Sequence, residues 1–159
     1  MSDKVKIEVI DRRHFLIMTG AGVTAATMLA GLAGTAEAKA DLAAEYMSKV
    51  LAGAKPAEGK VKLTMPEIAE NGATVPTKVS VDSPMTDKDY CQEVHIISTK
   101  NPVAHICTFH FTPKSGKAEA SIRVRMATTQ DVIALARMSD GKWYMTKTTV
   151  KVTIGGCGG

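Results

Sequence analysis

The sequence predicts an all-β fold: an immunoglobulin-like antiparallel β-sandwich preceded by a short N-terminal helix. From Val61 onward, apolar residues alternate with polar ones in short runs, which is typical of half-buried strands. Turn signals such as Asn71-Gly72 and Asp140-Gly141 separate these runs. About seven or eight short strands with turns between them are the pattern of a sandwich, and a small closed barrel is the alternative.

Residues 1–38 are predicted to be an export signal rather than part of the folded domain. The pair Arg12-Arg13, followed by an apolar stretch, resembles the twin-arginine export motif, although Asp11 stands where Ser or Thr is usual. The stretch ends in an Ala-Glu-Ala cleavage pattern at residues 36–38. It is only modestly apolar, which favours a cleaved signal over a membrane anchor. We therefore predict a periplasmic protein without a stable membrane anchor.

The rest of the chain is predicted to form a domain at 39–154 and a C-terminal arm at 155–159. This length is sufficient for one packed core. Asp41 is placed to cap a helix with an apolar stripe that ends before Gly53 and Pro56. The strands that we expect after this helix lie at residues 61–65, 75–82, 90–98, 103–111, 122–126, 132–138, 143–146 and 148–154.

Composition argues against a nucleic-acid partner. The formal net charge is +4, and positive and negative side chains are mixed along the chain. Aromatic residues make up 4% of the sequence, which is too few for the stacking surface of a single-strand binder. We therefore interpret the charges as a solvated surface.

The last strand leads into an arm in which one cysteine is flanked by four glycines: Gly155, Gly156, Cys157, Gly158 and Gly159. Glycine lacks a Cβ, so the arm is predicted to be thin and flexible. An extended chain spans about 3.3–3.6 Å per residue, so Cys157 can stand about 10 Å beyond Ile154. This reach suits delivery of a sulfur atom into another protein's pocket. No neighbouring residue can activate the thiol, so activation has to come from that protein.

Histidines and cysteines also gather on two of the predicted strands. Three histidines share two predicted strands with two cysteines: His95, His105, His110, Cys91 and Cys107. Their spacing matches no zinc or copper motif, so we predict ordinary strand histidines and no metal. Either a disulfide or two buried thiols fits the cysteine pair, and the expected register, with Cys91 opposite His110, argues weakly against the bridge. No catalytic motif is present, so the chain is predicted not to be an enzyme.

The ending VKVTIGGCGG resembles the SoxY family, the sulfur-carrying subunits of the bacterial thiosulfate-oxidising (Sox) system. Segments 66–76, 81–85, 111–119 and 139–145 are in the style of the same family, so the resemblance covers nearly the whole chain. The resemblance implies a covalent sulfur carrier with Cys157 as the attachment site. It also implies pairing with SoxZ, a second small β-sandwich subunit without the arm.

The resemblance further implies that partner enzymes act on the sulfur of Cys157. A c-type cytochrome joins thiosulfate to it oxidatively, and a manganese-dependent hydrolase removes the terminal sulfone group as sulfate. A molybdenum–haem sulfane dehydrogenase, where present, oxidises the remaining sulfane. No cofactor is implied other than the bound sulfur species, a thiosulfonate or a persulfide.

Two other functions remain as alternatives. The first is a thiocarboxylate carrier, because the chain ends in Gly158-Gly159, but the export signal argues against it. The second is a periplasmic β-sandwich binding or structural module in which Cys157 only forms an intermolecular disulfide.

Overall fold

The computed structural model describes residues 34–155. Arg12, Arg13 and most of the predicted export signal lie outside the described residues, as do Cys157, Gly156, Gly158 and Gly159. The described elements are α2 (Gly34–Leu51), β1 (Val61–Thr64), β2 (Ile68–Ala69), β3 (Val75–Val81), β4 (Cys91–Ser98), β5 (His105–His110), the short helix η1 (Pro113–Ser115), β6 (Ala118–Val124), β7 (Gln130–Met138) and β8 (Trp143–Val152).

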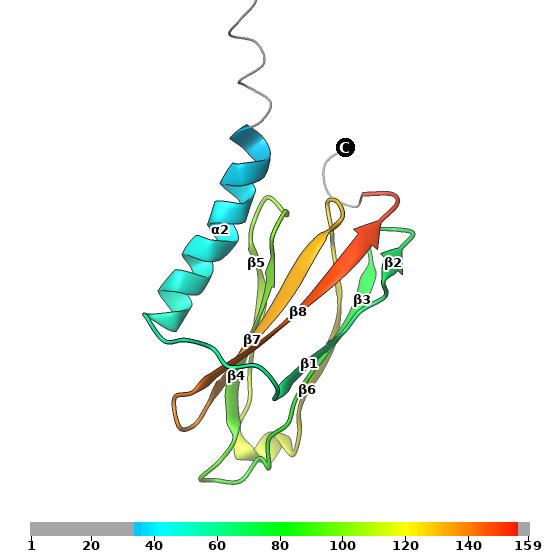
Figure 1. Ribbon diagram of the computed structural model, residues 1–159. Coiled ribbons are helices and arrows are strands. Elements are labelled where there is room, and N and C mark those ends of the chain that lie inside the picture. Colours follow the sequence, from blue (N-terminus) through cyan, green and yellow to red (C-terminus); the bar gives the residue numbers. More distant parts are fainter. Residues whose placement is uncertain (1–33, 156–159) are drawn as a thin grey trace, which may run out of the picture. The chain divides into compact units, whose positions relative to one another are not determined.

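The strands form two sheets, and the predicted all-β sandwich with an N-terminal helix is confirmed (Figure 1). One sheet has three strands in the order β1-β3-β6, and the other has five in the order β2-β8-β7-β4-β5. All pairings are antiparallel except that of β2 with β8, which is parallel. Helix α2 packs on the outer face of the five-stranded sheet, where Ala43 and Leu135 belong to one buried cluster.

The five-stranded sheet is buried on both faces, and β7 shows it most clearly. Val132, Ala134 and Ala136 belong to the core between the two sheets. Ile133 and Leu135 alternate with them and belong to the cluster under α2. A strand covered on both faces needs apolar residues at successive positions, which explains the continuous apolar run that β7 shows in the sequence.

Several boundaries differ from those expected. Helix α2 begins at Gly34, so Asp41 lies inside the helix and does not cap it. The alanines at residues 36, 38 and 40 favour helix, and the expected cap placed the start too late. The two expected closing strands are one continuous strand, β8, and β6 begins at Ala118, four residues before the predicted start. The two-residue strand β2 was not expected.

Within residues 34–155, no helix combines the length and the apolar character needed to span a membrane.

Candidate functional site

Strand β8 carries the chain to the base of the predicted arm. It is an inner strand of its sheet, with β7 on one side and β2 on the other. Near its end, the Val152 N–H donates to Thr129 Oγ1 at 2.9 Å, and the Thr153 N–H donates to the Ala69 carbonyl at 3.1 Å. The chain is therefore held by the sandwich up to Thr153.

The next two residues are also held, by loops from elsewhere in the chain. The Gly72 N–H donates to the Ile154 carbonyl at 2.7 Å, and the Gly72 carbonyl accepts from the Met126 N–H at 2.7 Å. Gly155 lies against the backbone of Ala127, and a Cβ added to Gly155 would lie 2.4 Å from the Ala127 carbonyl oxygen. Every residue except glycine would force one of these backbones to move. Gly155 therefore has a steric role at the arm base, in addition to the flexibility predicted for it.

A buried pair of amide side chains fixes the loop that contains Ala127. Asn101 Nδ2 donates to the Arg125 carbonyl at 2.8 Å, and Asn101 Oδ1 accepts from the Ala127 N–H at 3.0 Å. The Gln130 side chain donates to the same Oδ1 at 2.8 Å, and its own oxygen accepts from the Lys100 N–H at 2.9 Å. Asn101 and Gln130 are both buried. Leaving one such buried group without a partner costs about 1–3 kcal/mol, so this network resists deformation.

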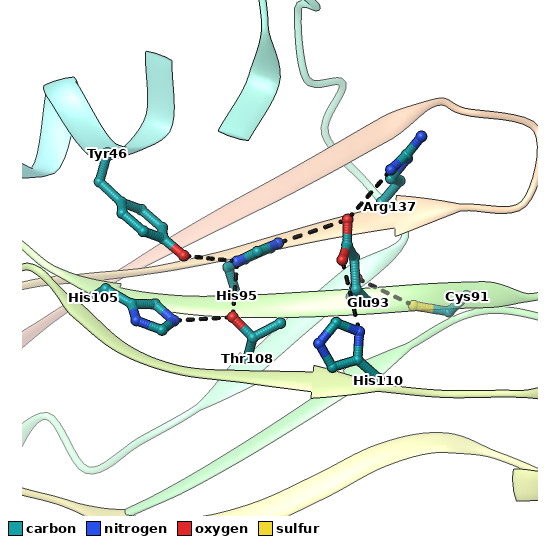
Figure 2. A network of polar contacts seen from close by, with 8 residues as sticks. All are labelled: Tyr46, Cys91, Glu93, His95, His105, Thr108, His110 and Arg137. Atoms are coloured by element: carbon teal, nitrogen blue, oxygen red, sulfur yellow. Dashed lines mark hydrogen bonds and ion pairs between the residues drawn. The ribbon is translucent and has the colours of Figure 1, made fainter. Parts of the chain in front are cut away.

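The three histidines lie in a polar cluster on the side of the five-stranded sheet that faces α2 (Figure 2). The Tyr46 hydroxyl and Thr108 Oγ1 lie 3.0 and 2.9 Å from His95 Nδ1. Thr108 Oγ1 also lies 2.9 Å from His105 Nε2, and the Tyr46 ring stacks on the His105 ring at a centroid distance of 4.7 Å. These contacts attach α2 to β4 and β5.

The other half of the cluster is centred on Glu93. Its carboxylate oxygens lie 3.5 Å from Arg137 Nη1, 3.7 Å from His110 Nδ1 and 3.8 Å from His95 Nε2 (Figure 2). His95 Nε2 is buried and has no hydrogen-bond partner among the described residues. Over residues 34–155, no group of three or more His, Cys, Asp or Glu side chains is arranged to hold a metal ion. Because Tyr46 of α2 contacts both His95 and His105, we interpret the cluster as an attachment between helix and sheet.

Burial lowers the pKa of His95 below its ordinary value; His105 and His110 add to this effect, and Glu93 opposes it. We therefore expect the free energy of unfolding to fall as the pH drops below about 6.5, the ordinary pKa of histidine. Below that pH, the unfolded chain binds a proton at His95 that the folded protein excludes, so acid favours unfolding. Urea unfolding at a series of pH values measures the effect. The slope of the unfolding free energy against pH should flatten in His95→Gln and persist in His110→Gln, because burial, the main cause of the lowered pKa of His95, remains in that variant. An unchanged slope in His95→Gln would contradict the assignment.

The two internal cysteines are both free thiols. Cys91 lies opposite Met138 on β7, and Cys107 lies opposite Ile96 on β4, so they do not face each other. The expected register was wrong, because Glu93 rather than Cys91 lies opposite His110. Burial raises the pKa of Cys91 to about 11 and also raises the pKa of Cys107. Neither cysteine is therefore suited to act as a nucleophile at neutral pH.

Sequence reasoning missed the residues that fix the base of the arm. Asn101 and Gln130 are far apart in the chain, and their pairing has no local pattern. Asn101 reads as an ordinary turn residue before Pro102. The one available signal was a buried strand, β7, that begins with a polar residue, Gln130. A polar side chain at a buried position predicts a partner, although it does not say which one.

Comparison with known proteins points to one family. A family model described as "Sulfur oxidation protein SoxY" matches residues 47–157. No relative was found among curated protein sequences. Among solved structures, the sulfur carrier protein SoxY from Chlorobium limicola f thiosulfatophilum is similar, with 29% identity and a TM-score of 0.61. The match covers 72% of this chain and 99% of that protein.

Superoxide reductases share the fold at lower identity. The neelaredoxin from Ignicoccus hospitalis has 13% identity and a TM-score of 0.52, over 59% of this chain and 80% of its own. The superoxide reductase from Nanoarchaeum equitans has 12% identity and a TM-score of 0.51, over 60% of this chain and 100% of its own. At such identities the likeness shows the fold alone.

Proposed function

The chain belongs to the SoxY family of sulfur oxidation proteins, and we propose that it is a periplasmic carrier that holds thiosulfate-derived sulfur on Cys157. The observation that carries this proposal is the position of that cysteine. The family match extends to residue 157, and the described sandwich holds the chain as far as Gly155, two residues earlier. The thiol is therefore attached to a folded domain by a very short arm.

The length of the arm sets how partner enzymes reach the thiol. Two extended residues span about 7 Å, so Cys157 reaches about that far beyond Gly155. A partner with a buried active site must then approach the end of the sandwich where β8 leaves it. Ile154 stands at that end with 69% of its surface exposed and is available for such an approach.

The other two thiols of the chain do not compete for the sulfur. A thiol with a pKa of about 11, such as Cys91, is ionised in roughly one molecule in ten thousand at pH 7. An unperturbed thiol, with a pKa near 8.5, is ionised in a few per cent of molecules at that pH. Cys107 is also disfavoured, because burial raises its pKa. A partner that uses a thiolate would therefore select Cys157.

In the proposed cycle, partner enzymes carry out each reaction on the sulfur of Cys157. The Cys157 thiolate and the outer sulfur of thiosulfate form a sulfur–sulfur bond, and the two electrons lost pass to a c-type cytochrome. Hydrolysis by a manganese-dependent thiosulfohydrolase then adds water, releases sulfate and two protons, and leaves a persulfide on Cys157. A sulfane dehydrogenase, where present, oxidises that sulfur further. This chain supplies the attachment atom and its placement.

We also propose that the chain works as a heterodimer with a SoxZ-like β-sandwich subunit after export by the twin-arginine route. The family assignment supports the pairing, and the Arg12-Arg13 motif supports the route. Two edge strands support such a pairing: in the described part of the chain β5 and β6 each lie at the edge of a sheet, and an edge strand can pair with a strand of another subunit.

Intact mass spectrometry with the modified residue mapped tests the proposed function. The mature protein is incubated with thiosulfate, the c-type cytochrome and the SoxZ-like subunit. We expect a thiosulfonate adduct on Cys157 that becomes a persulfide when the hydrolase is added. A modified C-terminal carboxyl group would instead support a thiocarboxylate carrier. A disulfide-linked dimer with no sulfur adduct would support a binding or structural module.

A further inference from the structure

The base of the arm is built from three loops at one end of the sandwich. Gly72, in the loop between β2 and β3, is bonded through its N–H to the Ile154 carbonyl and through its carbonyl to the Met126 N–H, both at 2.7 Å. This buried glycine therefore joins the end of β8 to the loop between β6 and β7. Figure 1 shows the end of β8 beside the start of β7 and the β2–β3 connection.

The third loop, between β4 and β5, contributes Asn101. Its side chain binds the Arg125 carbonyl and the Ala127 N–H, which belong to the two residues that flank Met126. Gln130 binds Asn101 Oδ1 from the first residue of β7 and the Lys100 N–H with its own oxygen. Asn101 thus fixes both ends of the segment that presents the Ala127 carbonyl to Gly155, and Gln130 holds the Asn101 side chain in place.

We propose that Asn101 and Gln130 are positioning residues for the carrier arm, because they hold the Ala127 carbonyl against Gly155 and so place the pivot of the arm at Gly155. This inference rests on the proposed function, since it concerns delivery of the Cys157 sulfur. Neither residue touches the thiol or the substrate. Their effect is transmitted through the backbone of residues 125–127 to Gly155.

The position of the pivot determines how concentrated the thiol is at a docked enzyme. With the pivot at Gly155, Cys157 reaches about 7 Å. If the base opened, the last held residue would be Thr153, bonded to the Ala69 carbonyl, and the reach would rise to about 14 Å. The accessible volume scales with the cube of the reach. The concentration of thiol at a fixed active site would then fall by roughly eightfold.

Two variants and one matched control test this inference. Asn101→Ala removes three hydrogen bonds from the loop, and Gly155→Ala places a methyl group against the Ala127 carbonyl. Asn71→Ala is the control: it makes the same substitution at an exposed position beside Gly72, where the side chain bonds only the nearby Ala73 N–H among residues 34–155. Circular dichroism establishes that each variant is folded, and if Asn101→Ala is not, Gly155→Ala decides alone.

Three measurements are made on the full mature chain. Amide hydrogen exchange at Gly72 and Ala127 measures how often the base of the arm opens. The rate of alkylation by iodoacetamide measures the intrinsic reactivity of Cys157. Turnover by the c-type cytochrome with thiosulfate gives kcat and KM for the carrier. In both variants we expect faster amide exchange, unchanged alkylation and a roughly eightfold lower kcat at unchanged KM. A role in folding alone would not lower kcat selectively.

The outcomes separate this inference from the proposed function. If wild-type Cys157 takes up no sulfur, the proposed function fails. If wild type is modified but both variants keep wild-type kcat despite faster amide exchange, the carrier function stands and the pivot is wrong. Amide protection that does not change in either variant would equally overturn it, as would a loss of kcat in Asn71→Ala of the same size.

Discussion

Replacing Cys157 with serine is expected to abolish sulfur carriage while the sandwich stays folded. A serine hydroxyl has nearly the same size as a thiol, but it forms neither the thiosulfonate nor the persulfide bond. The two described cores contain no residue beyond Val152, so the free energy of unfolding should change by less than about 0.5 kcal/mol. Intact mass after incubation with thiosulfate and the cytochrome measures carriage, and urea unfolding measures stability.

The matched control is Cys107→Ser. Cys107 lies on β5 with its side chain packed against the core, and burial raises the pKa of its thiol. This variant should lose some stability and retain the full adduct on Cys157. A sulfur adduct that persists in Cys157→Ser, or one that maps to Cys107 in the wild type, would overturn the proposed function.

The fold could be predicted from the sequence because its strands carry clear local patterns. Alternation in β1 and β3 and the turn at Asn71-Gly72 depend on side chains close together in the chain. The continuous apolar run of β7 fits its burial on both faces, with α2 covering the outer one. The start of α2 failed for a local reason, because helix-favouring alanines precede the expected cap, whereas the register of β4 with β5 failed for a non-local one. A bulge between Ile96 and Ile97 shifts the pairing of β4 with β5, which no hairpin rule on the sequence anticipates.

Part of the candidate site could likewise be predicted from the sequence, and part of it could not. The thiol and its glycines are readable in the sequence because they are consecutive, and the predicted thin arm follows from the absence of side chains. Its base is not readable, because it depends on a backbone contact between Gly155 and Ala127 and on a hydrogen bond between Asn101 and Gln130. In the sequence, Gly155 cannot be distinguished from the other glycines of the arm. In the folded protein, however, this position requires glycine for a steric reason.

Replacing both Gly156 and Gly158 with leucine is expected to slow enzymatic turnover roughly tenfold or more while leaving the chemistry of the thiol intact. A Cβ closes regions of backbone conformation that glycine can use, and the leucine side chains make the arm thicker. Leucine is uncharged, as glycine is, so the electrostatic surroundings of the thiol stay the same. Iodoacetamide should therefore modify it at the wild-type rate. A small displacement of the reacting atoms is enough to lower the rate by about a hundredfold. Turnover with the c-type cytochrome and with the thiosulfohydrolase measures access for two differently shaped active sites.

The control for added hydrophobic surface is Ser48→Leu, which places the same side chain at an exposed position of α2. It should be processed normally by both enzymes. The contrast between slow enzymes and a normal small reagent separates a requirement for access from a requirement for reactivity. If both enzymes process the double leucine variant at the wild-type rate, the glycines are not needed to bring Cys157 into narrow pockets. The arm would then act only as a tether, and its composition would have another cause.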